Sequence, residues 1–341
     1  MINAEKICLI WYDFFVENET KNFTPEEIEH SLITDYKYFL WRKFTKALKV
    51  YDLIQSGDRI LVCISGGKDS MLLALLFKHL KKYTDVPFDV KYMVMDPGYN
   101  KENMDLIYEN LRKLHIEAAI VKTDIFQIAN NTDRKPCYLC AKMRRGALYR
   151  IATELGCNKS ALGHHYDDVI ETTLMNLLNA GSFQTMLPKL HSDNYQDVDL
   201  IRPLYFIREK DIISWAKDNN LHFIRCACRF TEIYKNQEEE EDNISQRYKT
   251  KLLIQELKKT YSPVVEKNLF RAGENVNLDM VLGYKENGKV HSFLDDYEEK
   301  GKENKEKIQS CNLQEQALEK AFKEHKALII DESYFYLKEE K

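Results

Sequence analysis

The sequence predicts an α/β fold in which a parallel sheet is flanked by helices, with a small helical N-terminal extension and a C-terminal appendage. Through the central part of the chain, short apolar runs typical of buried strands alternate with longer segments of helical periodicity. Glycine-containing or polar turns separate them. Alternation of this kind makes successive strands parallel, and ligands bind such sheets at the carboxyl ends of the strands.

The chain of 341 residues is long enough for one large domain with appendages. Residues 1–36 are predicted to form the helical extension, in which Thr24 and Pro25 suit the start of a helix. Residues 37–265 form the main domain. Residues 266–341 form a charged appendage that contains a hairpin turn at Asn287-Gly288.

Within the main domain the apolar runs predict strands over residues 60–64, 90–95, 118–121, 160–163, 199–204 and 223–224. Helices are expected between them and after them, over residues 70–76, 101–114, 142–155, 169–178, 209–219 and 244–261. Ser65, Asp96 and His164 each follow the end of a predicted strand. We therefore expect these three residues to face one crevice.

Charged residues make up 30% of the chain and the net charge is −4, so the protein as a whole is not a basic nucleic-acid binder. The stretch from Arg134 to Arg150 nevertheless holds six cations and no acid. This stretch suits either local RNA binding or a solvated helix face. The sequence has no apolar run long enough to span a bilayer and no secretory pattern, so a cytoplasmic location is expected.

The segment Ser65-Gly66-Gly67-Lys68-Asp69-Ser70 joins a β-branched run to a helical one. Two glycines allow a sharp turn and a close approach of the backbone to a ligand, and the N–H groups at the helix start favour an anion. Lys68 adds a positive charge, and the serines add hydroxyl groups. Val62 stands where a Walker A loop needs glycine. The segment predicts a phosphate-binding loop, with a plain strand-to-helix turn as the alternative.

Cys137 and Cys140 are separated by two residues, a spacing that lets two thiolates bind one metal centre. Cys226 and Cys228 follow the strand predicted at residues 223–224 and could reach the same crevice. Three or four thiolates there would suit Zn²⁺ or an iron–sulfur cluster. A redox dithiol, or cysteines that are merely buried, remain alternatives.

Taken together, these motifs resemble the tRNA 2-thiocytidine synthetases, a family of PP-loop ATP pyrophosphatases. The resemblance covers roughly residues 39–264 and includes the segments Ser65–Ser70, Cys137–Cys140, Met143–Gly146, Ala161–Asp168, Pro188–Leu190, Ile201–Leu204 and Arg208–Ile212. Members of the family adenylate the C2 oxygen of a cytidine in the tRNA anticodon loop and replace that oxygen with sulfur. They use a [4Fe–4S] cluster held by three cysteines.

The resemblance implies a role for several residues. ATP would be bound by Ser65, Gly66, Gly67, Lys68, Asp69, Ser70, Asp96, Gly163, His164 and Asp168. Lys68 and Asp69 would be catalytic. Cys137 and Cys140 would bind the cluster, with Cys228 or Cys226 as the third ligand, and Arg144 and Arg145 would bind RNA. Asp69 and Asp96 could also contact Mg²⁺, and Asp168 could instead form a capping box with Glu171.

The implied cofactors are ATP, Mg²⁺ and a [4Fe–4S] cluster, with zinc as the alternative. The implied partners are tRNA, a sulfur donor such as a cysteine desulfurase, and a second copy of the chain, without a membrane. Two other functions fit the same motifs. One is a PP-loop ligase, amidotransferase or other tRNA-modifying adenylating enzyme with a structural zinc site. The other is an RNA-binding module that has lost turnover.

Overall fold

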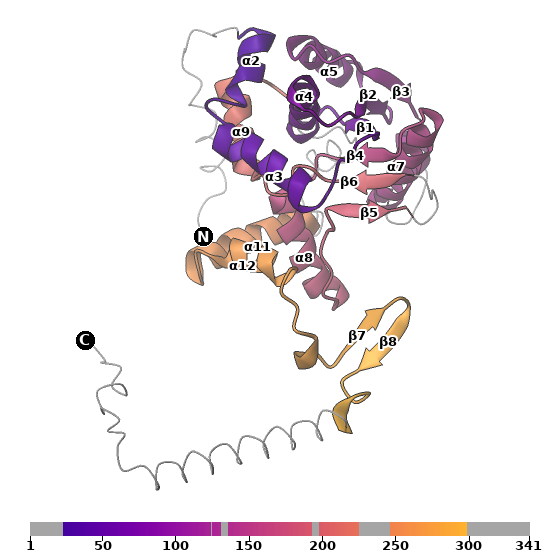
Figure 1. Ribbon diagram of the computed structural model, residues 1–341, viewed down its shortest axis with the longest axis vertical. Coiled ribbons are helices and arrows are strands. Elements are labelled where there is room, and N and C mark those ends of the chain that lie inside the picture. Colours follow the sequence, from indigo (N-terminus) through magenta and orange to yellow (C-terminus); the bar gives the residue numbers. More distant parts are fainter. Residues whose placement is uncertain (1–22, 124, 131–135, 193–197, 225–245, 299–341) are drawn as a thin grey trace, which may run out of the picture. The chain divides into compact units, whose positions relative to one another are not determined.

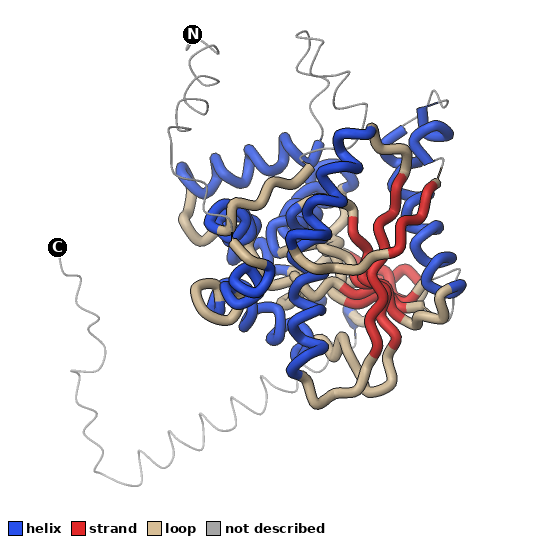
Figure 2. Tube along the Cα trace, turned by 90° about the horizontal axis from the view of Figure 1, so that it is seen from above, coloured by secondary structure: helices blue, strands red, loops and turns tan. Residues whose placement is uncertain are grey.

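The computed structural model describes residues 23–123, 125–130, 136–192, 198–224 and 246–298. Contacts divide the chain into two compact units, Met1–Glu274 and Asn275–Lys341. The first unit holds a six-stranded sheet flanked by helices (Figure 1), and helices lie on both sides of the strands when the view is turned (Figure 2). The division falls after Glu274, whereas the sequence places the start of the appendage at residue 266.

The central sheet has the order β3-β2-β1-β4-β6-β5. Its strands are β1 (Arg59–Ile64), β2 (Asp89–Asp96), β3 (Ala119–Lys122), β4 (Lys159–Ala161), β5 (Lys189–His191) and β6 (Asp199–Ile201). All neighbours pair in parallel except the edge strand β5, which runs antiparallel to β6. The predicted parallel α/β sheet is therefore confirmed, with one antiparallel edge strand that the sequence did not predict.

The chain order creates a switch point beside β1. From β1 the chain moves outward through β2 to β3, and it then returns to place β4 on the opposite side of β1. Val62 accordingly pairs with Tyr92 of β2 on one side and with Ala161 of β4 on the other. Loops that follow β1 and β4 diverge at such a point, which is where open α/β sheets bind their ligands.

Alternate residues of β1 enter two different cores, as a strand buried on both faces requires. Ile60, Val62 and Ile64 join the larger core, which includes α4 (Lys68–Tyr83), α5 (Lys101–Lys113), α8 (Tyr166–Ala180) and α9 (Glu209–Asp218). Leu61 and Cys63 join the smaller core with α6 (Ile125–Asn130) and α7 (Pro136–Glu154). Cys63 is a buried free thiol, as expected from its place in an apolar strand.

The first described helix, α2 (Pro25–Ser31), begins as the sequence predicts. The Thr24 hydroxyl accepts the Glu27 amide, and the Glu27 carboxylate accepts the Thr24 amide at 2.8 Å. This capping box satisfies two amide groups that a helix start leaves without partners. The π-helix η1 (Lys37–Trp41) and α3 (Arg42–Val50) follow, and they add Leu40, Phe44 and Ala47 to the larger core.

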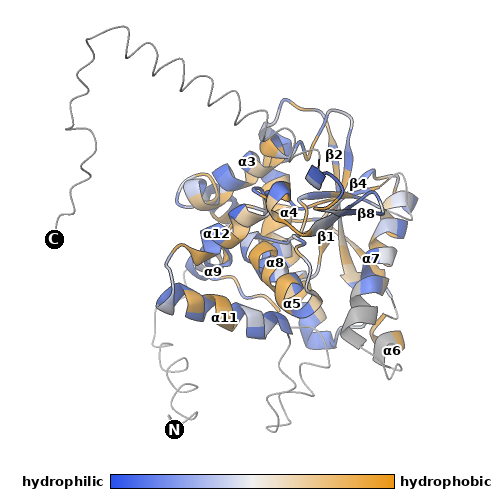
Figure 3. Cartoon of the chain, turned by 90° about the horizontal axis from the view of Figure 1, so that it is seen from below, coloured by the Kyte–Doolittle hydropathy of each residue, from blue (hydrophilic) through white to orange (hydrophobic). Residues whose placement is uncertain are grey.

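Two helices near the end of the first unit pack on α8. They are α11 (Gln246–Thr260) and α12 (Val265–Ala272), which also contact each other. Hydrophilic and hydrophobic residues alternate in bands along α11 (Figure 3), and Thr250 and Ile254 are its buried residues. The expected amphipathic helix is thus present, and it packs on α8 and α12.

The second unit, as far as the structure describes it, is a short 3₁₀ turn η3 (Leu278–Met280) followed by the hairpin of β7 (Gly283–Glu286) and β8 (Lys289–Ser292). Asn287 and Gly288 both have positive φ, 50° and 78°, as a two-residue hairpin turn requires. The predicted hairpin turn is confirmed. No helix in the described ranges is long and apolar enough to cross a membrane.

Several elements differ from the sequence-based prediction, among them β6, which ends at Ile201 instead of residue 204, and α4, which spans Lys68–Tyr83 instead of residues 70–76. Residues 223–224 are not a strand, α7 begins at Pro136 instead of residue 142, and α8 begins at Tyr166 instead of residue 169. The earlier start of α7 means that Cys137 and Cys140 lie in a helix and not in a turn.

Candidate functional site

The loop Ser65–Ser70 is held by its own serines. The Ser70 hydroxyl donates to the Gly67 carbonyl at 2.9 Å and accepts the Ser65 amide at 3.1 Å. The Ser65 hydroxyl lies 3.2 Å from the Ser70 hydroxyl. Gly67 is the residue that caps α4, and the helix start behind it favours an anion. Ser70 therefore shapes the loop in the structure, in addition to the ligand contact that the sequence suggests.

Two glycines allow close approaches at this loop. Gly66 has a φ of +80°, and a Cβ there would lie 2.6 Å from Ile107 and 2.8 Å from Ile224. After β4, a Cβ on Gly163 would lie 3.0 Å from the backbone of Asp69 and Ser70. The chain after β4 thus lies directly against the start of α4. The backbone segments that follow β1 and β4 are consequently adjacent, while the crevice shared by Ser65, Asp96 and His164 stays a prediction.

Lys68 is held between two carboxylates. Its ammonium group lies 3.2 Å from Asp69 Oδ2 and 3.0 Å from Oε1 of Glu209, the first residue of α9. The other oxygen of Glu209 accepts from Lys251 of α11. Burial by itself would raise the pKa of Glu209, but the Lys251 hydrogen bond and the Lys68 charge lower it to about 2. Glu209 is therefore an anion between two cations.

The start of α8 adds a second group of charges. His165 caps the helix in a capping box with Asp168, whose Oδ2 accepts the His165 amide at 3.0 Å. Arg247 of α11 lies 2.5 Å from Asp168 Oδ1 and 3.5 Å from Glu171. The capping box expected between Asp168 and Glu171 is wrong, because α8 begins three residues earlier and makes Asp168 the reciprocal partner of His165.

Burial shifts several pKa values in this group. It raises the pKa of Asp69, with a smaller contribution from the charge of Asp168. It raises the pKa of Glu171 to about 7 and lowers that of His164 to about 4. For Asp168 burial is outweighed by His165, His164 and Arg247, which lower its pKa. His164 is thus neutral at physiological pH, while Asp168 is ionised. Clusters of groups with shifted pKa values are typical of functional sites.

Asp96 lies at the end of β2, as predicted, and its Oδ1 accepts the amides of Gly98 and Tyr99 at 2.9 and 2.8 Å. These bonds close the turn that follows the strand. The Tyr99 hydroxyl then donates to the Ser65 carbonyl at 3.1 Å. Asp96 is therefore connected to the phosphate loop through this turn, and its described contacts are structural.

The two arginines proposed for RNA lie in different environments. The guanidinium of Arg144 lies 5.2 Å from the centre of the Phe126 ring, a cation–π contact between α7 and α6. Arg145 is exposed. Burial, followed by the charge of Arg145, lowers the pKa of Arg202 to about 10, so Arg145 lies near the end of β6.

Of the cysteines proposed as ligands, Cys137 and Cys140 lie three residues apart in the first turns of α7, whose first residue is Pro136. Cys226 and Cys228 lie outside the described residues. Among the residues that are described, no group of three His, Cys, Asp or Glu forms a metal site.

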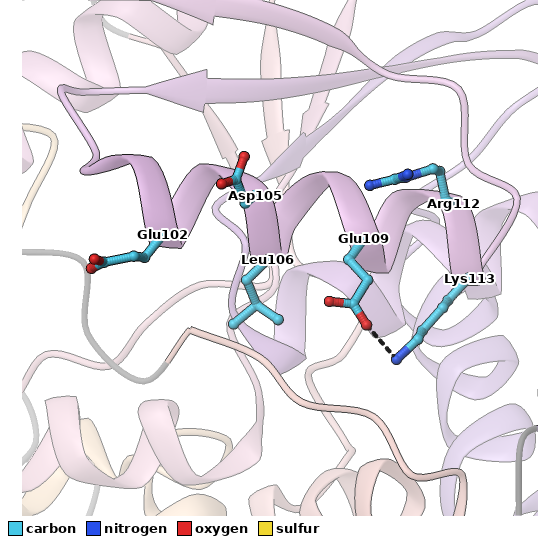
Figure 4. Close-up of a pocket in the computed structure, with 6 residues that line it drawn as sticks. All are labelled: Glu102, Asp105, Leu106, Glu109, Arg112 and Lys113. Atoms are coloured by element: carbon cyan, nitrogen blue, oxygen red, sulfur yellow. Dashed lines mark ion pairs between the residues drawn. The ribbon is translucent and has the colours of Figure 1, made fainter.

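A surface hollow on α5 is separate from these groups (Figure 4). Glu109 and Lys113 form an ion pair of 2.7 Å in this hollow. The residues that line it all belong to α5 and are Glu102, Asp105, Leu106, Glu109, Arg112 and Lys113. None of the residues expected to bind ATP lines it.

Sequence reasoning missed four charged residues that surround the predicted site: Glu209, Arg247, Lys251 and Arg202. Glu209 and Arg202 lie within segments that carry the family resemblance, so their positions could have been singled out. Arg247 and Lys251 lie in no motif. Their spacing of four residues on an amphipathic helix was their only signal.

Comparison with known proteins gives matches in both sequence and structure. A family model described as a PP-loop domain matches residues 40–235. The tRNA-cytidine(32) 2-sulfurtransferase of Citrifermentans bemidjiense is 36% identical over 236 residues, covering 68% of this chain and 88% of that protein. The enzyme of the same name from Geotalea uraniireducens is 36% identical over 252 residues, covering 73% and 94%.

Among solved structures, the U34-tRNA thiolase NcsA from Methanococcus maripaludis, with its [4Fe-4S] cluster, has a TM-score of 0.55 at 22% identity. The match covers 73% of this chain and 82% of NcsA, and it shows a shared fold. From the PP-loop match and the extent of the sequence identity, we conclude that the chain belongs to the tRNA-cytidine 2-sulfurtransferase family of PP-loop proteins.

Proposed function

We propose that this protein is an ATP-dependent tRNA thiolase that replaces the C2 oxygen of an anticodon-loop cytidine with sulfur. The cytidine oxygen attacks the α-phosphorus of ATP, the bond between the α- and β-phosphates breaks, and pyrophosphate leaves. A sulfur nucleophile then attacks C2, the C–O bond breaks, and AMP leaves. The observation that carries the proposal is the glycine loop between β1 and α4, with Lys68 at the helix start, in a member of this family.

The nucleotide half of the reaction is assigned to the loop Ser65–Ser70. Gly66 and Gly67 let the backbone approach the phosphates, and the start of α4 supplies a positive electrostatic environment. The Lys68 ammonium offsets the charge that develops on the leaving pyrophosphate. Asp69 and Asp168 are the carboxylates that suit Mg²⁺ on the phosphates, with Asp96 supporting the loop through Tyr99.

Neutral His164 and the backbone at Gly163 follow β4 on the other side of the loop. An uncharged imidazole can exchange hydrogen bonds with an adenine or a pyrimidine, and no charge has to be removed from water when the base binds. We assign these two residues to the nucleoside, and we assign exposed Arg145 to the RNA backbone. Arg144 packs on Phe126 and would support that surface from behind.

The sulfur half is assigned to the cysteines. The two-residue spacing of Cys137 and Cys140 suits two ligands of one centre, and thiolates are the donors that iron–sulfur clusters require. Cys228 or Cys226 would supply the third ligand. A [4Fe–4S] cluster held by these cysteines would supply an open iron site for sulfide, the nucleophile that replaces the C2 oxygen.

The test is mass spectrometry of nucleosides from tRNA of cells with and without this protein, together with thiolation by the anaerobically purified chain. We expect 2-thiocytidine to disappear without the protein. Lys68→Ala should lower thiolation about 100-fold or more, because it removes a charge that stabilises the transition state. Cys137→Ala should abolish thiolation and iron content while ATP binding persists.

The matched control is Cys157→Ala, a buried cysteine on the smaller core that should leave iron and acid-labile sulfide in place. Unchanged 2-thiocytidine in cells lacking the protein would contradict the proposed substrate. Stoichiometric zinc without acid-labile sulfide would contradict the cluster.

A further inference from the structure

Four charged groups alternate in sign across three helices beside the phosphate loop. They run from Lys251 of α11 through Glu209 of α9 to Lys68 and Asp69 of α4. The two carboxylate oxygens of Glu209 bind different lysines: Oε1 lies 3.0 Å from the Lys68 ammonium, and Oε2 accepts a hydrogen bond from Lys251. Its side chain is only 21% exposed, and the side chain of Lys68 is 25% exposed. Water therefore screens these charges weakly.

This arrangement creates a competition at Lys68. The ammonium group that a triphosphate needs is already hydrogen-bonded to Glu209, which is ionised. A triphosphate that approaches Lys68 meets this carboxylate as a rival acceptor and as a repelling charge. Glu209 cannot relieve the conflict by taking up a proton, because its pKa lies far below physiological pH.

The position of Lys251 relieves this competition at Lys68. It binds the Glu209 oxygen that faces away from Lys68, so the carboxylate keeps a cationic partner when Lys68 turns to phosphate. Arg247, one helical turn earlier, fixes α11 by its ion pair with Asp168 at 2.5 Å, and buried Ile254 anchors the next turn. Contacts on both sides of Lys251 along α11 therefore fix the position of this lysine.

We propose that Lys251 is a positioning residue of the nucleotide site, which neutralises Glu209 and thereby frees Lys68 for the triphosphate without itself contacting ATP. The inference rests on the proposed function, since it takes ATP as the ligand of the Ser65–Ser70 loop. It also assigns a role in nucleotide binding to α11, which lies beyond residue 235, where the PP-loop match ends.

The test is a double-mutant cycle on the full chain, with the dissociation constant of ATP measured by calorimetry in the presence of Mg²⁺. Lys251→Met should weaken ATP binding about tenfold, a change of about 1.4 kcal/mol. Glu209→Gln should bind ATP at least as tightly as the native chain. The double variant Glu209→Gln with Lys251→Met should regain the affinity of Glu209→Gln, because the competing carboxylate is gone.

Lys251→Arg should keep the native affinity, because it preserves the charge. The matched control is Lys258→Met on the same helix, which removes the 2.7 Å pair with Glu266 and should leave the ATP affinity within about twofold. Lys251→Gln, with a polar side chain of similar length, is a second test variant if Lys251→Met fails to fold. It should weaken binding by the same factor.

The outcomes separate the two proposals. A native chain that binds no ATP would overturn the proposed function, and this inference with it. If the native chain binds ATP and Lys251→Met binds it equally well, only the inference is overturned. A double variant that stays as weak as Lys251→Met would also overturn it, because Lys251 would then contact the nucleotide directly.

Discussion

The shape of the phosphate loop depends on single residues whose side chains are absent or small. Gly66 combines a left-handed backbone with contacts that leave no room for a Cβ, and Gly163 lets the chain after β4 lie against the start of α4. Both requirements are stereochemical and act before any ligand binds. The glycines thus allow the segments after β1 and β4 to lie in close contact.

Gly66→Ala should destabilise the protein by about 2–4 kcal/mol, because it adds backbone strain and a clash with Ile107 and Ile224. The measurement is urea unfolding followed by circular dichroism. Gly57→Ala is the control, since Gly57 has a φ of +86° but a Cβ added there would have nothing within 4 Å. Gly57→Ala should lower the free energy of unfolding by about 1 kcal/mol, because it adds backbone strain without a clash. Equal losses for the two variants would contradict the steric argument.

At the scale of elements, one arginine joins three helices. Arg208, which precedes α9, lies 2.9 Å from Asp167 of α8, contacts Glu266 of α12 at 2.6 Å, and lies over the Tyr166 ring. Burial would lower its pKa, but its hydrogen bonds with the two carboxylates raise it instead. The Asp167 carboxylate also accepts the Glu209 amide at 2.7 Å, so the same cluster fixes the start of α9.

Arg208→Met should lower the free energy of unfolding by about 3 kcal/mol, because it leaves two partly buried carboxylates without their cation. Hydrogen exchange should show that α12 loses protection first, since Glu266 is its link to α9. Lys113→Met, which removes an exposed i,i+4 pair with Glu109, should change stability by less than about 0.5 kcal/mol. Unchanged exchange in α12 would show that its packing on α8 and α11 holds it without Arg208.

Strands and helices were predicted correctly where the pattern of apolar residues was compatible with one type of element only. The strand β1 is an apolar run after its first residue and β2 ends in one, and both strands appear within one residue of their predicted limits. The three-residue strand β5 has no such run, and its pairing with β6 exists only through tertiary contact. At residues 223–224 an apolar pair resembled a strand, but Ile224 is buried in the larger core beside the phosphate loop.

On the scale of the whole chain, the structure separates a unit with two buried cores from a second unit that contributes to neither. Every buried residue among those described lies before Asn275. A two-stranded hairpin such as β7–β8 is marginal by itself in water. The stability of the first unit should therefore be independent of the second.

A chain that ends after Glu274 should melt within about 2 °C of the full chain, which for a unit of this size is less than about 1 kcal/mol. Differential scanning calorimetry measures this, and ATP binding by the shortened chain is the functional check. A chain that ends after residue 264 is the comparison. It loses α12, and with it Glu266 and Phe270, and should be clearly destabilised. A large loss for the first truncation would contradict the division into units.

Local patterns in the sequence were enough to establish the α/β class, the phosphate loop and the strand ends that carry Ser65, Asp96 and His164. These patterns are the spacing of apolar residues, the conformational freedom of glycine and the residues that begin helices. Each of them determines local structure within a few residues. Tertiary folding was needed to bring Lys251 and Arg247 to the site, to place Glu209 against Lys68, and to pair Asp168 with His165 instead of Glu171. An ion pair between residues 68 and 209 has no local signature, since chain folding alone brings those charges within 3.0 Å.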